Sequence, residues 1–166
     1  MDLVFATNNK NKLKEIKHII IDKINILSIN DLNHSDDLEE TGLTLKDNAS
    51  QKARFIYKKF NKNCFADDSG LEILSLNNEP GVFSARYAGL NCSADDNMNK
   101  VLKKLESIKN RNAIFKTVIC LILDGKEYFF EGSIEGIITN EKIGHNGFGY
   151  DPIFRPNNFN LTFAQM

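Results

Sequence analysis

Short apolar runs alternate along the chain with segments in which apolar residues recur every three or four positions. The first run, from Leu3 to Ala6, has the length and composition of a buried strand. Polar turn residues follow it, and the apolar stripe at Leu13, Ile16 and Ile20 then has the spacing of one helix face. The alternation from Ile24 to Ile29 predicts a second strand. This order of elements is typical of an α/β fold.

Two further helices are predicted from capping residues that precede apolar stripes. Thr44 can cap a helix whose core-facing residues recur at helical spacing. Ser93 can cap the next helix, with Asp96 three residues later as in a capping box. The stripes consist of Leu45, Ala49, Ala53, Ile56, Tyr57 and Phe60 in the first of these helices and of Met98, Val101, Leu102 and Leu105 in the second.

The second half of the chain contains a strong hairpin signal. Two long segments, 114–123 and 127–138, are separated by Asp124 and Gly125, a pair that favours the tight turn between antiparallel strands. No linker, repeat or low-complexity segment divides the chain. We therefore expect one α/β domain over residues 1–166, built around a mixed central sheet that contains the long hairpin.

Composition narrows the classes of function. The chain has 166 residues, and its hydrophobic content of 42% suits one compact domain with a genuine core. Lys and Arg number 21 against 22 Asp and Glu, so the net charge of -1 gives no global electrostatic reason to expect nucleic acid or a membrane surface as a partner. No apolar run reaches membrane-spanning length, and the start of the chain lacks the layout of a signal peptide. The three cysteines form no C-x-x-C pair, so we expect reduced thiols in a cytoplasmic protein.

Two adjacent carboxylates, Asp67 and Asp68, follow an apolar run and precede a serine and a glycine. At the end of a buried strand these carboxylates repel each other and lose solvation, and a shared cation relieves both costs. Oxygen ligands without a Cys or His cluster favour Mg²⁺ or Mn²⁺, and Glu39 or Glu40 in the preceding acidic loop could complete the site. A surface turn and a solvated acidic loop are the alternatives.

The segment from Thr7 to Lys12 lies between the first strand and the first helix. Free N–H groups at the start of a helix, together with the helix dipole, form an anion site. We expect Lys12 to contact phosphate because it falls in the first helical turn, whereas Lys10 and Lys14 fit a solvated face. The segment lacks the glycines of a P-loop.

The segment from Gly147 to Pro152 has glycines on both sides of Phe148, which lets the backbone approach a flat ligand. Phe148 could stack on a nucleobase, with Tyr150 as a second aromatic surface. A tight aromatic turn over the core is the alternative. Arg86 follows a Pro-Gly loop and is open to two interpretations, a ligand contact or a structural salt bridge.

In this order, these segments closely resemble the inosine triphosphate pyrophosphatase family. The likeness covers essentially the whole chain. The matching residues are Phe5 to Asn9 with Lys12, Glu40 to Gly42, Asn48 and Ala49 with Lys52 to Arg54, Ala66 to Leu71, Pro80 and Gly81 with Ser84 to Gly89, and Gly147 to Pro152 with Phe154. The resemblance implies two α/β lobes around a cleft, a homodimer, dependence on Mg²⁺, and hydrolysis of purine nucleoside triphosphates such as ITP, dITP and XTP to the monophosphate and pyrophosphate.

The resemblance also implies roles for individual residues. Glu40 and Asp68 would bind the metal, and Asp68 would accept the proton of the attacking water. Asn8 stands where some relatives carry glycine, which narrows the space for backbone approach. The residues expected to bind the substrate are Thr7, Asn8, Asn9, Lys10, Asn11, Lys12, Ser69, Phe148, Gly149, Tyr150 and Asp151.

Family members continue past the segment that matches residues 162–166 into a Ser-His-Arg motif that reads the purine, whereas this sequence stops at Met166. We therefore expect a chain that is C-terminally truncated relative to the family, with weakened base discrimination, lower activity or both. Phe159, Leu161 and Phe163 are the apolar residues that we expect to be exposed. A nucleotide-binding protein that has lost catalysis is the first alternative. An enzyme of similar fold that acts on modified pyrimidine nucleotides or on nucleoside diphosphates is the second.

Overall fold

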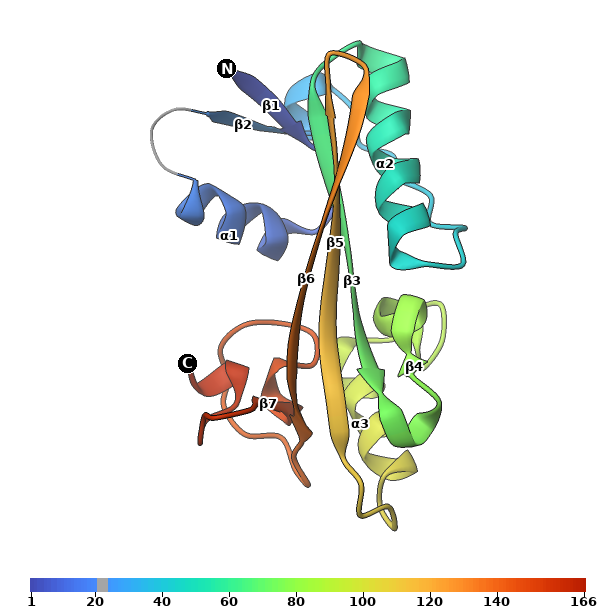
Figure 1. Cartoon of the computed structure of the whole chain (residues 1–166), viewed down its shortest axis with the longest axis vertical. Coiled ribbons are helices and arrows are strands. Elements are labelled where there is room, and N and C mark those ends of the chain that lie inside the picture. Colours follow the sequence, from blue (N-terminus) through green and yellow to red (C-terminus); the bar gives the residue numbers. More distant parts are fainter. Residues whose placement is uncertain (21–23) are drawn as a thin grey trace. The chain divides into compact units, whose positions relative to one another are not determined.

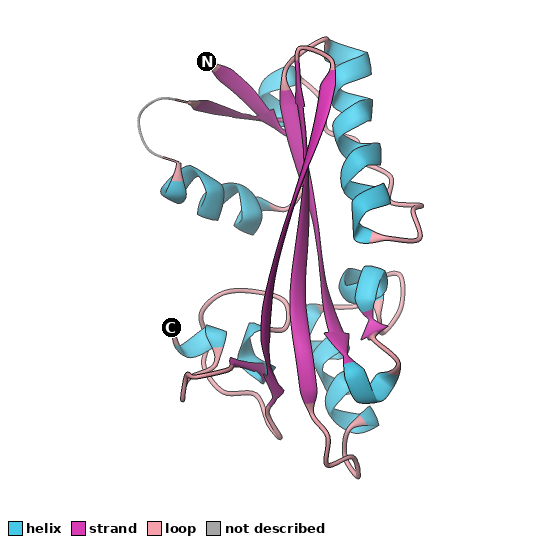
Figure 2. Ribbon diagram, in the orientation of Figure 1, coloured by secondary structure: helices cyan, strands magenta, loops and turns pink. Residues whose placement is uncertain are grey.

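The computed structural model describes residues 1–20 and 24–166. Residues 1–68 and 117–131 form one compact unit, the first unit, and residues 69–116 and 132–166 form another, the second unit. Helices and strands occur in both units, and parallel and antiparallel pairs make the sheet mixed, as the sequence predicts (Figures 1 and 2). The single domain expected over residues 1–166 stays a prediction. The long strands that contribute residues to both units are β3 (Cys64–Ile73), β5 (Asn112–Leu123) and β6 (Lys126–Ile138).

In the first unit, helices cover both faces of a sheet in which β1 to β3 are parallel. Strand β1 (Asp2–Phe5) pairs with β2 (Asn25–Ser28) and with the start of β3. Successive side chains of a strand point to opposite faces, so one set packs against α1 (Lys10–Ile19) and the other against α2 (Leu45–Phe60). The α2 side includes Val4, Ala6, Ala49, Ala53, Ile56, Cys64, Ala66, Cys120 and Ile122, and the α1 side includes Leu3, Phe5, Ile26 and Phe65.

The second unit has its own apolar core beside α3 (Ala94–Lys104). Strand β4 (Glu79–Pro80) pairs with β3, and β7 (Phe154–Pro156) pairs with β6, both antiparallel. The core includes Leu71, Ile73, Met98, Val101, Leu105, Ala113, Ile138, Tyr150, Ile153 and Phe154. Short 3-10 helices occur at Asn30–Leu32 in the first unit and at Leu74–Leu76, Gly81–Arg86, Asp151–Ile153 and Phe163–Gln165 in the second.

The turn and cap predictions are confirmed. The Thr44 hydroxyl accepts a hydrogen bond from the Asp47 amide at the start of α2, and Ser93 forms a reciprocal capping box at the start of α3. Asp124 and Gly125 both have positive φ, 48° and 78°, which is the conformation that a type I′ hairpin turn requires. These features depend on neighbouring residues alone, and this is why the sequence predicts them well.

The final segment packs more closely than the sequence suggests. Phe159 and Leu161 are exposed, as expected. The expectation for Phe163 is wrong, because its ring lies 5.1 Å from the ring of Phe154 and 5.9 Å from that of Phe115, centroid to centroid. Within residues 1–20 and 24–166, no helix has both the length and the apolar character needed to cross a membrane.

Candidate functional site

Asp67 and Asp68 lie within β3, which continues without a break from Cys64 to Ile73. The strand end expected at the two carboxylates is therefore wrong, and so is the alternative of a surface turn. Both aspartates are buried, with 7% and 6% of their surface exposed. Burying carboxylates costs free energy unless hydrogen bonds or opposite charges compensate for the lost solvation. The partners of these two groups therefore define the site.

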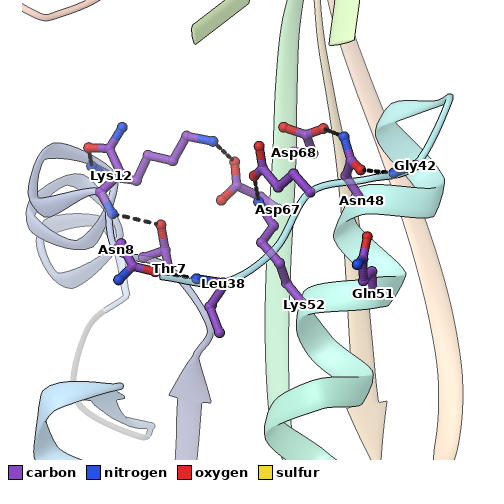
Figure 3. Close-up of polar contacts among 12 residues, drawn as sticks. Thr7, Asn8, Lys12, Leu38, Gly42, Asn48, Gln51, Lys52, Asp67 and Asp68 are labelled. Atoms are coloured by element: carbon purple, nitrogen blue, oxygen red, sulfur yellow. Dashed lines mark hydrogen bonds and ion pairs between the residues drawn. The ribbon is translucent and has the colours of Figure 1, made fainter. Parts of the chain in front are cut away.

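The Asp67 carboxylate pairs with a cation from α1. The Lys12 ammonium nitrogen lies 2.6 Å from Asp67 Oδ2, as Figure 3 shows. At the start of the same helix, the amides of Asn11 and Lys12 donate hydrogen bonds to the side chain of Asn9. The expectation of free amides is therefore wrong for these two groups. Contact between Lys12 and phosphate stays a prediction, and in this structure the ammonium is held beside Asp67.

The Asn8 side chain connects the predicted phosphate segment to the acidic loop. Its Nδ2 donates to the Asp36 carbonyl at 3.3 Å. Its Oδ1 accepts from the Leu38 amide, also at 3.3 Å (Figure 3). In the same segment, the Thr7 hydroxyl oxygen accepts a hydrogen bond from the Asn9 amide at 3.1 Å. The side chains of this segment therefore fix the turn between β1 and α1, and their contacts with substrate stay predictions, as do those of the exposed Lys10 and Asn11.

The Asp68 carboxylate meets a side chain of α2. Asn48 Nδ2 donates a hydrogen bond of 2.9 Å to Asp68 Oδ2. Burial raises the pKa of the Asp68 carboxyl, and the negative charge of Glu40 acts in the same direction. The positive charge of Lys52 and the hydrogen bond from Asn48 lower the same pKa in part. Asp68 is therefore a carboxylate whose affinity for a proton is set by its surroundings, a property common among catalytic acids and bases.

The loop that carries Glu40 is held by one face of α2. Lys52 pairs with Glu40, and the Thr41 amide donates to Gln51. The Gly42 amide donates to Asn48 (Figure 3). Residues three and four apart share one face of a helix, so Asn48, Gln51 and Lys52 present their polar groups together. The site predicted from the sequence does not include these three residues of α2. Their sequence signal is a pair of polar residues, Asn48 and Lys52, four positions apart and each next to a core alanine.

The carboxylates fit a small divalent cation. The negative charge of Glu40 raises the pKa of the Asp68 carboxyl, so a cation that bound both carboxylates would relieve their repulsion. In the part of the chain that the structure describes, no cluster of three or more His, Cys, Asp or Glu side chains could hold a metal. Two carboxylates are sufficient for Mg²⁺, which usually keeps several waters and binds substrate phosphates as well.

The other predicted substrate residues belong to the second unit. Ser69 follows Asp68 directly in β3 and is the first residue of that unit. The Tyr150 side chain is buried and donates a hydrogen bond of 2.8 Å to the Ser84 carbonyl, and burial strongly raises its pKa. Tyr150 thus packs in the core of its unit, where the sequence suggested an aromatic surface. Contact of Ser69 and Tyr150 with substrate stays a prediction.

The loop before Tyr150 is closed by Asp151. Its Oδ2 accepts a hydrogen bond of 2.8 Å from the Phe148 amide. Gly147 has φ +72°, and a Cβ at this position would lie 2.0 Å from Asp151 Oδ2. Gly149 also has positive φ. The glycines therefore permit a tight turn around the aspartate, and the contacts of Phe148, Gly149 and Asp151 with base and sugar stay predictions.

Arg86 lies elsewhere in the second unit. Its guanidinium carbon is 5.4 Å from the centre of the Phe83 ring, within the range of a cation–π contact. This contact tests neither interpretation, so the ligand contact and the structural salt bridge of Arg86 both stay predictions.

Comparison with known proteins gives consistent results. The model of the Ham1 family matches residues 3–166. The dITP/XTP pyrophosphatase of Flavobacterium johnsoniae is 56% identical over 166 residues, which are 100% of this chain and 86% of that protein. The dITP/XTP pyrophosphatase of Porphyromonas gingivalis is 49% identical over 99% of this chain and 85% of its own length.

Solved structures agree with the sequence comparisons. The Ham1 protein of Staphylococcus aureus superposes with a TM-score of 0.88 at 42% identity, covering 100% of this chain and 86% of that one. A HAM1 protein from Coxiella burnetii gives a TM-score of 0.90 at 38% identity, over 100% of this chain and 87% of that one. At these identities the likeness extends beyond the fold to the family.

Proposed function

The chain belongs to the Ham1 family, and on that premise we propose that it hydrolyses non-standard purine nucleoside triphosphates, namely dITP, XTP and ITP, to the monophosphate and pyrophosphate. Two of its most similar relatives carry the name dITP/XTP pyrophosphatase at 56% and 51% identity over the full length of this chain. The observation that carries the proposal is the buried Asp68 carboxylate beside Asn48, Lys52 and Glu40. Such an enzyme would remove damaged purine nucleotides from the cellular pool.

In this proposal Asp68 accepts the proton of the water that attacks the triphosphate. An ordinary aspartate has a pKa of about 3.9 and is a weak base at neutral pH. Burial raises the pKa of Asp68, which makes the carboxylate a better proton acceptor than a solvated one. Asn48 holds one carboxylate oxygen by a hydrogen bond, so the group is oriented before the substrate arrives.

Lysine side chains at this site supply positive charge for the phosphates. In the structure Lys12 pairs with Asp67 and Lys52 pairs with Glu40. Each ammonium is thus fixed in a largely buried position, where electrostatic interactions are stronger than in water. We propose that Lys12, in the first turn of α1, stabilises the charge that develops on the leaving pyrophosphate.

Glu40 and Asp68 are the residues that would hold Mg²⁺. Bound there, the ion would neutralise phosphate charge and make a coordinated water more acidic. The support is the character of the donors, because carboxylate oxygens are the ligands that Mg²⁺ prefers. We propose further that Ser69 and Phe148 to Asp151 contact the base and sugar, and that the protein acts as a cytoplasmic homodimer, as its resemblance to inosine triphosphate pyrophosphatases implies.

The test is product analysis with purified protein and Mg²⁺. Incubation with dITP should release pyrophosphate and dIMP, with slower release from dGTP and dATP. Release of orthophosphate and dIDP would contradict the assignment of the bond that is cleaved. Mg²⁺-dependent binding of dITP without any turnover would instead identify a nucleotide-binding protein.

A further inference from the structure

Asn48 is a fully buried polar residue, and both the nitrogen and the oxygen of its side-chain amide form hydrogen bonds. Its relative exposure is 0%. On one side Nδ2 donates to Asp68 Oδ2 at 2.9 Å, and on the other Oδ1 accepts from the Gly42 amide at 2.8 Å (Figure 3). The side chain therefore connects β3 directly to the loop that carries Glu40.

The chemistry of the neighbours fixes the orientation of this amide. An ionised carboxylate only accepts hydrogen bonds, and a backbone N–H only donates. If the Asn48 amide were rotated by 180°, its oxygen would face the Asp68 carboxylate and its NH₂ group would face the Gly42 N–H. A side chain of this size must carry one donor and one acceptor to satisfy both neighbours, and asparagine does so.

The position of Gly42 has no room for a side chain, because the backbone lies close to Asp47 and Asn48. A Cβ at this position would lie 2.5 Å from Asp47 Cβ and 2.7 Å from Asn48 Oδ1. Any other residue would push the loop away from α2 and lengthen the hydrogen bond to Asn48. The close approach of Gly42 is thus a second observation, independent of the Asp68 contact, that the loop is built around the Asn48 amide.

We propose that Asn48 is a positioning residue for hydrolysis, which holds the Asp68 carboxylate in a fixed orientation relative to the Glu40 loop. This inference rests on the proposed function, in which Asp68 accepts the proton of the attacking water. A base must be aimed at the proton that it removes, and small misplacements of a reacting group reduce turnover more than they reduce binding. Asn48 contacts neither the water nor the phosphates in this proposal, and it acts through Asp68.

Gln51 offers a matched control on the same helix. It holds Thr41, the neighbour of Gly42, through hydrogen bonds of 3.1 to 3.3 Å, so its removal also loosens the Glu40 loop. Asn48 differs from Gln51 in its hydrogen bond to Asp68. Comparing substitutions at the two positions separates loosening of the loop from misplacement of the carboxylate.

Two substitutions of Asn48 separate its two hydrogen bonds. Asn48→Asp keeps an acceptor for the Gly42 amide but replaces the amide donor to Asp68 by a second carboxyl group, which repels Asp68 when both are ionised. Asn48→Leu removes both. Hydrogen exchange of the Gly42 amide reports the first bond without any activity measurement: it should stay protected in the wild type and in Asn48→Asp, and exchange faster in Asn48→Leu. Asn48→Asp has almost the volume of the native residue, which makes it the informative variant if Asn48→Leu does not fold.

The experiment measures kcat and KM for pyrophosphate release from dITP by the wild type, Asn48→Asp, Asn48→Leu and Gln51→Ala. Both Asn48 variants should lose about 10²-fold in kcat, with KM changed less than about threefold, and Gln51→Ala should keep kcat within about threefold. Equal losses in kcat for Gln51→Ala and Asn48→Asp, or an unchanged kcat in Asn48→Asp with Gly42 still protected, would overturn the inference. If the wild type releases no pyrophosphate, the proposed function itself is wrong. A loss of release that is confined to the variants concerns the role of Asn48 alone.

Discussion

The two units bury their polar side chains for different purposes. In the first unit, Asp67 and Asp68 are buried beside Lys12 and Asn48, so side chains satisfy one another. In the second unit, the buried Tyr150 donates to the Ser84 carbonyl, and the half-buried Asp151 accepts from the Phe148 amide. Burying a charged side chain costs free energy, and apolar residues would avoid that cost. A cluster of buried charged side chains therefore indicates a functional site. Hydrogen bonds from a side chain to the backbone stabilise the fold, and this role is enough to account for them.

The motif at Asp67 and Asp68 and the motif at Tyr150 differ in what the structure places around them. Both motifs concentrate polar and aromatic residues in a short stretch of the sequence. Around Asp67 and Asp68, the structure adds partners that no single motif contains, namely Asn48 and Lys52 of α2. Around Tyr150, it shows a buried aromatic residue within the core. Activity should therefore be sensitive to changes in the first unit, and stability to changes at Tyr150.

Removal of divalent metal should have the largest effect. Treatment with EDTA should lower the release of pyrophosphate from dITP by about 10³-fold, because the carboxylates of Glu40 and Asp68 would then face the triphosphate without a neutralising ion. Steady-state rates with and without chelator measure this. Addition of Mg²⁺ should restore the rate, and far-UV circular dichroism should not change. If EDTA leaves the rate unaltered, the proposed dependence on a divalent metal is wrong.

The thiols of the two units should differ in reactivity. Burial raises the pKa of Cys64 to about 12 and that of Cys120 to about 11, and both lie in the core of the first unit. The thiolate is the reactive form, so at pH 8 these two thiols should react with iodoacetamide at least about 10²-fold more slowly than the partly exposed Cys92 of the second unit. Peptide mass spectrometry after timed alkylation measures the rates. All three should react quickly in urea, and rapid native alkylation of Cys64 would contradict the first-unit core.

Tyr150→Phe should affect stability more than activity. It removes the hydrogen bond to the Ser84 carbonyl and leaves that buried acceptor without its donor, which typically costs about 1 to 2 kcal/mol. Urea unfolding measures the change in the free energy of unfolding. Turnover of dITP should stay within about twofold, since the hydroxyl donates inside the core and phenylalanine keeps the aromatic ring that would contact the base or sugar. A large loss of turnover at unchanged stability would show that the hydroxyl serves the substrate.

Asn8→Ala should have the smallest effect. It removes two exposed hydrogen bonds of 3.3 Å that join the β1–α1 turn to the loop at Asp36 and Leu38. Long, exposed hydrogen bonds contribute little, so unfolding should become easier by only about 0.5 kcal/mol. Urea unfolding again provides the measurement. A loss above about 2 kcal/mol would mean that this loop is more important to the first unit than its contacts indicate.

Local features were predictable from the sequence, and tertiary ones were not. The caps at Thr44 and Ser93 and the turn at Asp124 depend on residues close in the chain, and all three are confirmed. Phe163 was misjudged because its partners, Phe115 and Phe154, come from distant segments. A capping residue carries its own signal, whereas burial of a side chain depends on what packs against it.

The candidate site shows the same division. Two adjacent carboxylates after an apolar run were sufficient to single out Asp67 and Asp68, since such residues are costly to bury. The roles of Asn48 and Gln51 could not be predicted, because they depend on α2 lying beside the Glu40 loop. Their position on one helix face becomes meaningful only once the fold is known.

The most direct test of the account is the substitution Asp68→Asn. It replaces the proposed proton acceptor, which is also a proposed Mg²⁺ ligand, by a neutral group of the same shape. At saturating Mg²⁺, kcat for pyrophosphate release from dITP should fall by about 10³-fold. Binding of dITP, measured by calorimetry, should stay within about threefold of the wild type, because Glu40 and the lysines remain. The wild type under identical Mg²⁺ and pH is the reference. Turnover by Asp68→Asn at the wild-type rate would contradict the assignment of Asp68 as the base, and with it the central claim that the buried carboxylates of the first unit perform the reaction.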